Sequence, residues 1–519
     1  MALLSIDNGV FSFGDKKILD GVSFSINPGD KIGLVGDNGT GKSTLLKLLM
    51  GQLSLDSGTV TKSRNLGKIG YIEQDIPTEL ENQTLYDVLL RSLPQEEQLY
   101  NSWKVDVALD DIGAPEEIRH KKMSELSGGW RRLALIARTN LDEPDLLILD
   151  EPTNYLDLEK ILHLENWFAS NVKCPYLLIS HDRQFLDNVT SRTVTLRNGK
   201  LIDIKQPFSV AREIILKQDI LDAEKRQAQE DEIKRLERAS KRVILWGKYN
   251  TSLAKKGKAI QTRADKMKQD LTDVYKEKRR DVNLRAEELR PNIALRIQDV
   301  TISTPDERRL FGIQELFVAK GDRIALLGMN GTGKTQFLKR LERAYSEQQS
   351  LTSGIRFNPQ VNMGYFDQNM DVLPRNESIY NYMVKNTKLP DSSIRSALVG
   401  AGFPYKEHDK KISQLSFGER ARFLFLALHS LHKNFFILDE PTNHLDIDGQ
   451  EKLEDELMES ENTTIFVSHD RHFVRTVANR FVMIDKGRLV EISEPEEFYN
   501  KLKFYNSNVS MMMLPEKTR

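Results

Sequence analysis

Two glycine-rich segments have the residue types and the spacing needed to hold a triphosphate. Residues 36–43 read GDNGTGKS and residues 328–335 read GMNGTGKT, so both match the pattern GxxxxGK[S/T]. In such a loop the glycines let backbone N–H groups surround phosphate oxygens, the lysine reaches the β- and γ-phosphates, and the last hydroxyl ligates Mg²⁺. The residues expected to contact ATP are Gly36, Asp37, Asn38, Gly39, Thr40, Gly41, Lys42, Ser43 and Thr44 in the first loop and Gly328, Met329, Asn330, Gly331, Thr332, Gly333, Lys334, Thr335 and Gln336 in the second.

Two pairs of carboxylates follow apolar segments at matched positions. The sequences LLILDEPTN and FFILDEPTN begin at residues 146 and 435. Hydrolysis of a phosphoanhydride requires a positioned water and compensation of the charge on the γ-phosphate. We expect Asp150 and Asp439 to join Ser43 and Thr335 in the Mg²⁺ shell. Glu151 and Glu440 are the candidates for polarising the attacking water.

Histidine and glutamine residues complete the candidate chemistry. His181 and His469 both lie in the sequence SHDR, at the end of an apolar segment. A lone histidine is more often structural, but the matched contexts favour a catalytic role in compensating γ-phosphate charge. Gln74 and Gln368, in YIEQ and YFDQ, are candidate Mg²⁺ ligands and water sensors.

These residues belong to a long internal repeat. Five landmarks recur in the same order at intervals of about 290 residues, which indicates a duplicated domain. Residues 31–36 and 323–328 are apolar strands that lead into the glycine-rich loops, and helical spacing follows Lys42 and Lys334. The apolar segments 146–150 and 435–439 are typical of strands buried on both faces of a parallel sheet. The alternation of such strands and helices predicts an α/β fold.

The motif set resembles that of the ATP-binding cassette (ABC) superfamily. The resemblance rests on LSGGW at 126–130, LSFGE at 415–419, the two glutamines, LDEPT and the histidines. It implies an ATPase with two nucleotide-binding domains, each a P-loop NTPase core with a helical subdomain, paired head to tail with two ATPs between them. One ATP would lie between residues 36–43 and 416–419, and the other between residues 328–335 and 127–130. The residues it implies as additional ATP contacts are Ser127, Gly128, Gly129, Ser416, Gly418 and Glu419.

Three departures from that family pattern affect the sites. We refer to LSGGW at 126–130 and LSFGE at 415–419 as the first and second signature motifs. Trp130 stands where the family has Gln or Glu in the first motif, and Phe417 replaces the first glycine of the second. Both sites are still expected to bind ATP, and their rates could differ. Phe13 is the candidate for stacking on adenine in the first half, and no aromatic matches near Thr304 in the second.

The segment between the repeats predicts a helical hairpin. We expect domains at residues 1–205 and 292–505, a hairpin linker at 206–291 and a tail at 506–519, with hairpin arms at 211–246 and 259–290 around breakers at 247–257. Residues 241–280 hold 13 basic and 4 acidic residues, a net charge of +9. Such a patch favours contact with a phosphate backbone, although a solvated coiled coil is the alternative. The candidate RNA contacts are Lys241, Arg242, Trp246, Lys248, Tyr249, Lys255, Lys256, Lys258 and Arg263.

Composition limits the remaining possibilities. The 75 basic and 76 acidic residues give a net charge of −1, which argues against a uniformly basic nucleic-acid coat and an acidic disordered chain. The single cysteine, Cys174, excludes an intramolecular disulfide framework. No apolar run approaches the length needed to cross a bilayer, and the first ten residues lack a basic signal-peptide region, so a cytoplasmic protein is expected.

Two cassettes, a basic hairpin and no apolar membrane segment together resemble the ABC-F family. That resemblance implies a monomer that binds the ribosome near the tRNA exit site and directs its linker toward P-site tRNA, rRNA and the peptidyl-transferase centre. The interval from Gln74 to Leu126 leaves little room for the arm insertion of several housekeeping members, which favours protection of the ribosome against antibiotics. A housekeeping translation factor and an ATPase partner of a membrane transporter stay open, and a DNA-repair cassette ranks last.

Overall fold

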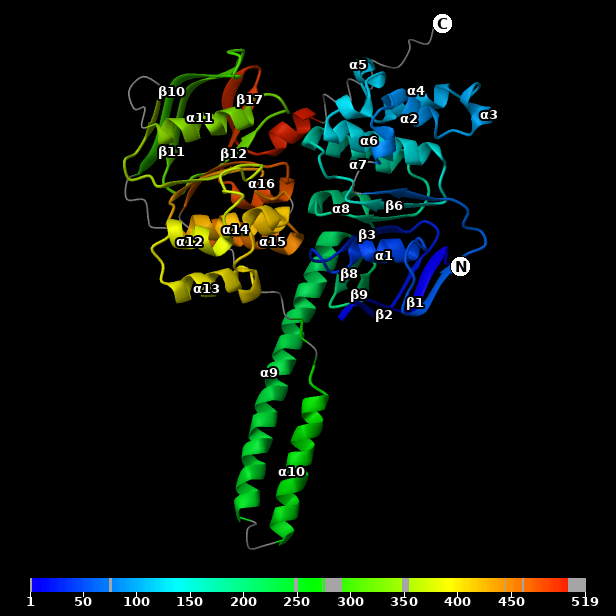
Figure 1. Cartoon of the computed structure of the whole chain (residues 1–519), viewed down its shortest axis with the longest axis vertical. Coiled ribbons are helices and arrows are strands. Elements are labelled where there is room, and N and C mark those ends of the chain that lie inside the picture. The colour runs from blue at the N-terminus through cyan, green and yellow to red at the C-terminus, as the bar shows by residue number, and fades with distance from the viewer. Residues whose placement is uncertain are drawn as a thin grey trace.

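The chain forms two α/β cassettes that lie side by side and a helical hairpin that projects from their base (Figure 1). This computed structural model describes residues 2–73, 77–246, 251–272, 274–275, 292–347, 354–443, 445–459 and 462–502. The predicted α/β class and the predicted pair of cassettes are confirmed. None of the helices in these ranges is both long and apolar enough to cross a membrane.

The first cassette contains two sheets. The antiparallel sheet has the order β2-β1-β4, with β1 (Leu4–Phe13), β2 (Lys16–Ile26) and β4 (Ser57–Lys62). The central sheet has the order β5-β6-β7-β3-β8-β9 and is parallel except for β9. Its strands are β3 (Lys31–Val35), β5 (Ile69–Ile72), β6 (Leu146–Asp150), β7 (Tyr176–Ile179), β8 (Arg192–Arg197) and β9 (Lys200–Ile204).

Helices cover this central sheet and build a separate helical layer. Helix α1 follows the first glycine-rich loop, while α2 to α6 form the helical subdomain between β5 and β6. The helices are α1 (Lys42–Leu49), α2 (Leu85–Leu90), α3 (Gln95–Gln98), α4 (Trp103–Asp111), α5 (Glu116–Arg119), α6 (Gly128–Leu141), α7 (Leu158–Ser170) and α8 (Arg183–Val189).

The second cassette repeats this plan, with its strands joined into one sheet. The order is β13-β10-β11-β18-β17-β12-β16-β15-β14, and a parallel pairing of Gly312 with Arg488 connects the two parts. The strands are β10 (Ile293–Ser303), β11 (Arg309–Ala319), β12 (Arg323–Leu327), β13 (Ile355–Phe357), β14 (Met363–Phe366), β15 (Phe435–Asp439), β16 (Thr463–Val467), β17 (Arg480–Asp485) and β18 (Arg488–Ile492). The helices are α11 (Lys334–Ser346), α12 (Ile379–Asn386), α13 (Asp391–Gly400), α14 (Phe417–Ser430), α15 (Ile447–Glu459) and α16 (Arg471–Val477).

Buried apolar strands place the functional loops of both cassettes. Every residue of β6 and of β15 is buried, as expected of strands covered on both faces. In each cassette the strand that ends in the Asp–Glu pair lies beside the strand that leads to the SHDR motif, β6 beside β7 and β15 beside β16. Since parallel neighbours end at the same edge, the Asp–Glu pair and the histidine meet there.

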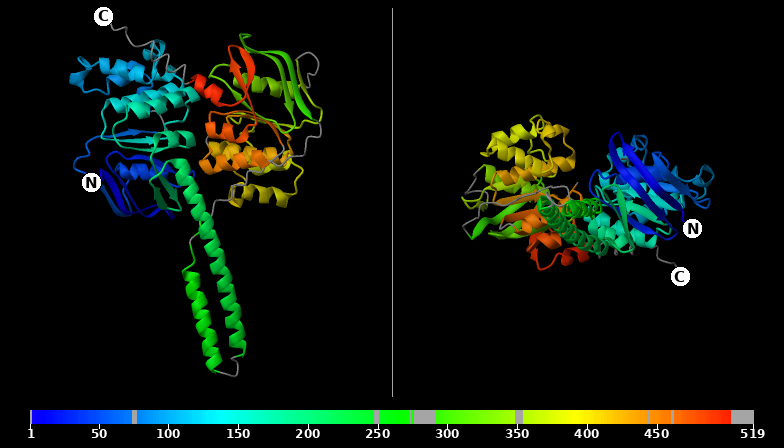
Figure 2. Two further views of the ribbon diagram at one scale, coloured as in Figure 1. Left: turned by 180° about the vertical axis from the view of Figure 1, so that it is seen from behind. Right: turned by 90° about the horizontal axis from the view of Figure 1, so that it is seen from below.

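The hairpin consists of helices α9 (Phe208–Trp246) and α10 (Thr251–Gln269), and it extends away from both cassettes (Figure 2). Two hairpin boundaries differ from those predicted from the sequence. The helix resumes at Thr251, so the predicted breaker segment 251–257 is helical, and α10 ends at Gln269 instead of continuing toward residue 290. Residues 276–291 lie outside the described residues.

Local contacts explain both differences. Gly257 is tolerated inside α10 because it lets the helix approach α9 closely: a Cβ atom there would lie 2.5 Å from Cγ1 of Ile244. Beyond Gln269 the backbone bonds to side chains of α9 instead of continuing the helix. The N–H of Thr272 donates to Oε1 of Gln229 at 2.9 Å, and Arg226 donates to the carbonyl of Thr272 at 2.9 Å.

Candidate nucleotide-binding and catalytic site

The two glycine-rich loops fold alike. We refer to residues 36–43 as the first P-loop and to residues 328–335 as the second P-loop. Gly41 and Gly333 have φ values of 106° and 105°, and a Cβ atom on Gly41 would lie 2.3 Å from the side chain of Ile18, so both positions require glycine. Nζ of Lys42 donates to the carbonyl oxygens of Gly36 and Asp37, and Nζ of Lys334 donates to those of the corresponding residues Gly328 and Met329.

The two glutamates that follow β6 and β15 face the histidines. Glu151 and Glu440 both have positive φ values, 51° and 52°. Oε2 of Glu151 accepts the backbone N–H of His181 at 3.3 Å, and Oε2 of Glu440 accepts that of His469 at 3.0 Å. The other carboxylate oxygens lie 3.2 and 3.3 Å from Nε2 of these histidines but accept no hydrogen bond there. Each glutamate therefore keeps one buried oxygen available at the cleft.

Burial dominates the electrostatics of both sites. It raises the pKa of Asp439 to about 6, with help from the charge of Glu440, against a hydrogen bond from Thr335 and the charge of Lys334. Burial likewise raises the pKa of Asp150, against a hydrogen bond from Ser43.

The cationic partners shift in the complementary direction. Burial lowers the pKa of Lys42 and of Lys334, although nearby carboxylates favour their charged forms. Burial also lowers the pKa of His181 and of His469, against the charges of the adjacent glutamates. Both sites are thus desolvated regions in which an added charge interacts strongly with its surroundings.

The oxygen donors at each site fit a magnesium ion held together with a nucleotide. Asp439 has a buried Oδ2 atom with no hydrogen-bond partner, and its neighbour Thr335 adds a hydroxyl. Across the described ranges there is no group of three or more His, Cys, Asp or Glu residues able to hold a metal alone. Mg²⁺ usually binds through one or two protein oxygens, water and substrate phosphates, so this donor set suits it.

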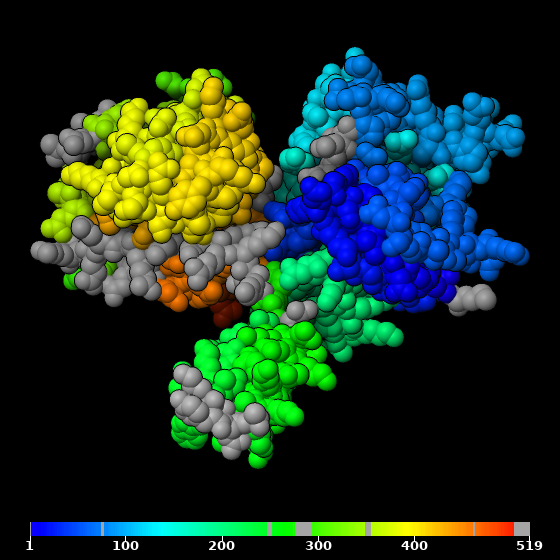
Figure 3. Space-filling model, turned by 60° about the horizontal axis from the view of Figure 1, so that its bottom comes forward, coloured from blue at the N-terminus to red at the C-terminus, as the bar shows by residue number. Residues whose placement is uncertain are grey.

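A single cleft of about 1530 Å³ lies between the cassettes and reaches both P-loops. Figure 3 shows the two lobes with a hollow between them and the hairpin below them. The volume exceeds the usual upper range for one drug-sized ligand. The expected site residues that line it are Phe13, Asn38, Gly39, Gly41, Lys42, Ser43, Thr44, Asp150, Glu151, His181, Asn330, Gly331, Gly333, Lys334, Thr335, Gln336, Gln368, Ser416, Gly418, Glu419, Asp439, Glu440 and His469.

Other expected contacts lie away from this cleft. The P-loop residues that do not line it are Gly36, Asp37, Thr40, Gly328, Met329 and Thr332. Ser127, Gly128 and Gly129 do not line it either, because the two glycines pack on their own cassette: a Cβ atom on Gly129 would lie 2.9 Å from the carbonyl oxygen of Tyr155. In this arrangement only the second signature motif faces the cleft. Gln74 lies outside the described residues.

The two signature motifs also differ in their hydrogen bonds. Ser416 caps helix α14: its hydroxyl accepts the N–H of Glu419 at 3.3 Å, while the carboxylate of Glu419 accepts the N–H of Ser416 at 2.8 Å. In the first cassette Trp130 occupies the position of Glu419 and cannot close this reciprocal pair. Ser127 accordingly begins α6 without a side-chain cap.

Aspartates that sequence reasoning did not select connect each P-loop to the opposite cassette. Oδ2 of Asp446 accepts the backbone N–H of Asn38 at 2.9 Å, and Oδ2 of Asp157 accepts from the side-chain amide of Asn330 at 2.9 Å. Both aspartates follow the repeated PTN segment, so their matched positions in the repeat could have revealed them. The guanidinium of Arg132 bonds the carbonyl of Asp150, and the second cassette has Ala421 at the matching position.

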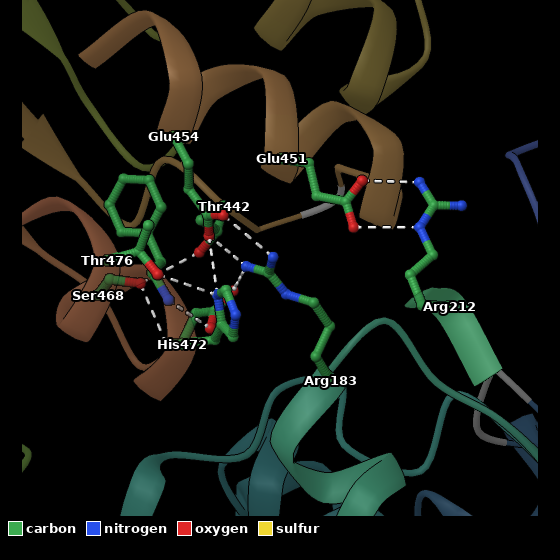
Figure 4. A network of polar contacts seen from close by, with 10 residues as sticks. Arg183, Arg212, Thr442, Glu451, Glu454, Ser468, His472 and Thr476 are labelled. Atoms are coloured by element: carbon green, nitrogen blue, oxygen red, sulfur yellow. Dashed lines mark hydrogen bonds and ion pairs between the residues drawn. The ribbon is translucent and has the colours of Figure 1, made fainter. Parts of the chain in front are cut away.

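A second set of contacts joins the cassettes directly, side chain to side chain. Figure 4 shows Arg183 of the first cassette pointing at Glu454 on α15 and Arg212 of α9 pointing at Glu451. Arg183 bonds both carboxylate oxygens of Glu454, and Arg471 bonds both oxygens of Glu165 in the reciprocal arrangement. All four side chains are largely buried.

The candidate RNA contacts lie near the end of the hairpin. Trp246 is 73% exposed, and Leu245 beside it is 74% exposed. The other described members of the set are exposed on the two helices: Lys241, Arg242, Lys255, Lys256, Lys258 and Arg263. Lys248 and Tyr249 lie outside the described residues.

Comparison with known proteins agrees with this architecture. Residues 19–154 and 314–443 match the family model described as "ABC transporter". The chain is 31% identical to the ATP-binding protein Uup of Buchnera aphidicola (subsp. Schizaphis graminum), over 93% of the chain and 80% of that protein. It is 29% identical to the putative ATP-binding protein YdiF of Bacillus subtilis, over 100% of the chain and 85% of that protein.

Solved structures with the same fold include a protein titled "RNase-L Inhibitor". Its TM-score is 0.63 at 18% identity, covering 96% of this chain and 93% of that one. A second is the complex of archaeal ribosomal stalk protein aP1 with the archaeal ribosome recycling factor aABCE1, with a TM-score of 0.64 at 17% identity, covering 96% and 92%. At these identities they show the fold alone. With both cassettes matched and relatives aligned along most of their length, this chain belongs to the ATP-binding cassette family, as a tandem-cassette ATPase of the ABC-F type.

Proposed function

We propose that this ATPase acts on the ribosome, where it binds near the tRNA exit site and directs its hairpin toward P-site tRNA and the peptidyl-transferase centre. The observation that carries the proposal is the basic, exposed hairpin that projects from the base of the cassettes (Figure 1). Helix α9 has 39 residues and is about 58 Å long at 1.5 Å per residue. The hairpin can therefore reach a target far from the nucleotide cleft.

The packing of the two helices supports a stiff probe. Ser240, Gly257 and Ala264 are buried between them, and the hydroxyl of Ser240 donates to the carbonyl of Gly257 at 2.9 Å. Small residues at this contact allow the helices to approach closely while the long basic side chains point to solvent. The apolar residues near the end do not all pack between the arms, since Leu245 and Trp246 stay exposed. These properties favour an RNA-contacting device over a solvated spacer.

Within the cleft, each ATP would use one P-loop. Ser43 with Asp150, and Thr335 with Asp439, would hold Mg²⁺, which supplies charge neutralisation at the phosphates when bound. Lys42 and Lys334 would leave their present carbonyl partners and bind the phosphates instead. Glu151 and Glu440 would orient water through the free carboxylate oxygen, with His181 and His469 beside the γ-phosphate.

The ATP site built on the second P-loop should receive weaker contacts from the first signature motif, which belongs to the opposite cassette. The first signature motif packs on Tyr155 and does not itself line the cleft, and it lacks the serine cap that Glu419 completes in the other. We accordingly propose that the site built on the second P-loop closes less readily, which would give the two sites unequal rates.

The remaining assignments follow from the ABC-F type. We propose a cytoplasmic monomer with domains at residues 1–205, 206–291 and 292–505, and protection of the ribosome against antibiotics as its role. A housekeeping translation factor would have the same site and partner, and an antibiotic-susceptibility panel with and without the gene separates the two. A transporter-coupled ATPase would instead associate with membranes.

Replacement of Glu151 and Glu440 by Gln tests the proposal. The doubly substituted protein should bind ATP but hydrolyse it at least about 100-fold more slowly, as expected when the group that orients water is lost. It should co-sediment with ribosomes when ATP is present. The control is Glu213→Gln together with Glu224→Gln, two exposed glutamates on α9. ATP-loaded protein that sediments free of ribosomes, or with membranes, would contradict the ribosome assignment.

A further inference from the structure

The base of the hairpin contacts the first P-loop directly. Tyr275, in the segment that returns from α10, donates its hydroxyl to Oδ2 of Asp37 at 3.2 Å. Asp37 is the second residue of that loop, and its carbonyl accepts from Lys42, Thr40 Oγ1 and the Thr40 N–H. A linker residue thus bonds to the side chain of a residue whose backbone shapes the phosphate-binding loop.

The tyrosine is held in place by the same cassette and by α9. The guanidinium carbon of Arg197 lies 4.1 Å from the centre of the Tyr275 ring, and Arg197 also donates to Asp219 of α9 at 2.6 Å. Arg197 is buried. Arg197 therefore contacts both segments of the linker base, helix α9 and the segment that follows α10, next to the first P-loop.

Helix α9, which leads out of the first cassette, contacts the second cassette close to the same P-loop. Arg212 of α9 donates to both oxygens of Glu451, at 3.2 and 2.6 Å (Figure 4). It also donates to Asp448 at 2.5 Å. Both acceptors are on α15, which begins directly after Asp446, the residue that accepts the backbone N–H of Asn38. The linker base therefore contacts both partners of the first ATP site, the P-loop and the helix that faces it.

The second P-loop has no such contact within the ranges that the structure describes. Met329 occupies the position of Asp37 and its thioether cannot replace a carboxylate acceptor. It is 39% exposed, whereas Asp37 is 8% exposed. Although the cassettes are repeats, the described part of the linker contacts only the first of the two P-loops.

We infer that Tyr275 is a positioning residue for the first ATP site and that the hairpin is coupled to this site alone. The physical reason lies in the charge of Asp37. A carboxylate within the P-loop repels the triphosphate, and the bond from Tyr275 keeps it directed toward the linker and partly compensates its charge. A displacement of the hairpin base would break this bond, let the carboxylate turn toward the phosphates and weaken ATP binding there. The inference rests on the proposed assignment of one ATP to each P-loop.

Tyr275→Phe tests the coupling, because it removes one hydroxyl and leaves the ring against Arg197. ATP binding is measured separately at each site, using Lys334→Ala to disable the second site and Lys42→Ala to disable the first. At the first site the substitution should raise the Kd and KM for ATP about three- to tenfold, the effect expected for one hydrogen bond, with kcat at saturation unchanged. At the second site both should change less than twofold. Tyr405→Phe, an exposed tyrosine of the second cassette, is the matched control.

A double-substitution cycle separates coupling from general loosening. In an Asp37→Ala background the acceptor is absent, so Tyr275→Phe should have no further effect on ATP affinity. An effect of equal size in that background, an equal change at both sites or no change at the first site would overturn the inference. If the Lys334→Ala protein binds no ATP at all, the assignment of the first site itself has failed.

Discussion

At the scale of single residues, the protonation of Asp439 links the second ATP site to stability. Its pKa of about 6 lies above the ordinary value of 3.8, because burial penalises its charged form. The folded state therefore binds more protons than the unfolded state between pH 4 and 6, and the stability of the nucleotide-free protein falls as pH rises through that range. A shift of this size corresponds to at most about 3 kcal/mol.

Asp439→Asn should remove this contribution. We expect the nucleotide-free variant to match the parent protein at pH 4 and to be more stable at pH 7, by up to about 3 kcal/mol. The measurement is the thermal unfolding midpoint at both pH values, and Asp371→Asn, which alters an exposed aspartate, is the control. If Asp439→Asn and its parent lose stability equally between pH 4 and 7, Asp439 is not the group responsible.

At the scale of secondary structure, the sequence predicted those elements whose residue pattern is local, such as apolar strands and glycine-rich loops. The strand, glycine-rich loop and helix around Lys42 follow from apolar runs and from backbone conformations that only glycine adopts freely. The hairpin was predicted too, with the correct end of its first helix at Trp246, but the start and the end of α10 were not. Gly257 reads as a helix breaker in isolation, and only the opposing Ile244 shows why α10 continues through it. Tertiary contact decided that boundary.

Neutralising part of the hairpin tests its role as an RNA contact. Lys255, Lys256 and Lys258 are exposed near the start of α10. Changing all three to Gln should weaken ribosome association about tenfold or more at low salt and reduce the slope of affinity against salt concentration by about 3 units, since each phosphate contact adds nearly one. Affinity is measured by co-sedimentation over a series of salt concentrations.

The matched control lies on the same hairpin. Lys217, Lys225 and Lys234 of α9 are also exposed, but each pairs with a carboxylate on its own helix: Glu213, Asp222 and Asp231. Their replacement by Gln should leave the salt dependence unchanged. Equal effects of the two triple substitutions would indicate a general charge effect instead of a specific RNA-contacting surface.

At the scale of the whole molecule, the relation between the cassettes was only partly predictable. The repeat indicated two like domains, and the family resemblance suggested where they meet. The contacts that fix their arrangement join residues far apart in the chain, such as Tyr275 with Asp37 across 238 positions and Arg183 with Glu454 across 271. No local sequence pattern indicates which of these distant residues pair. For the same reason the turning of the first signature motif toward Tyr155 could not be anticipated.

The reciprocal ion pairs Arg183–Glu454 and Arg471–Glu165 explain how the cassettes stay together without nucleotide. Breaking a buried pair leaves a carboxylate uncompensated and costs about 3–5 kcal/mol, whereas replacing both partners by apolar residues is often neutral. Arg183→Met should therefore let the cassettes separate in the absence of ATP, seen as a larger radius of gyration in solution scattering, and adding Glu454→Leu should reverse this. Arg375→Met, at an exposed arginine that pairs with Asp371 inside the second cassette, is the control. Because ATP adds contacts across the same interface, it should restore the compact form of Arg183→Met as well. A variant that is equally compact with and without ATP would mean that the remaining contacts, such as Arg471 with Glu165 and Arg212 with Glu451, are enough to hold the lobes together.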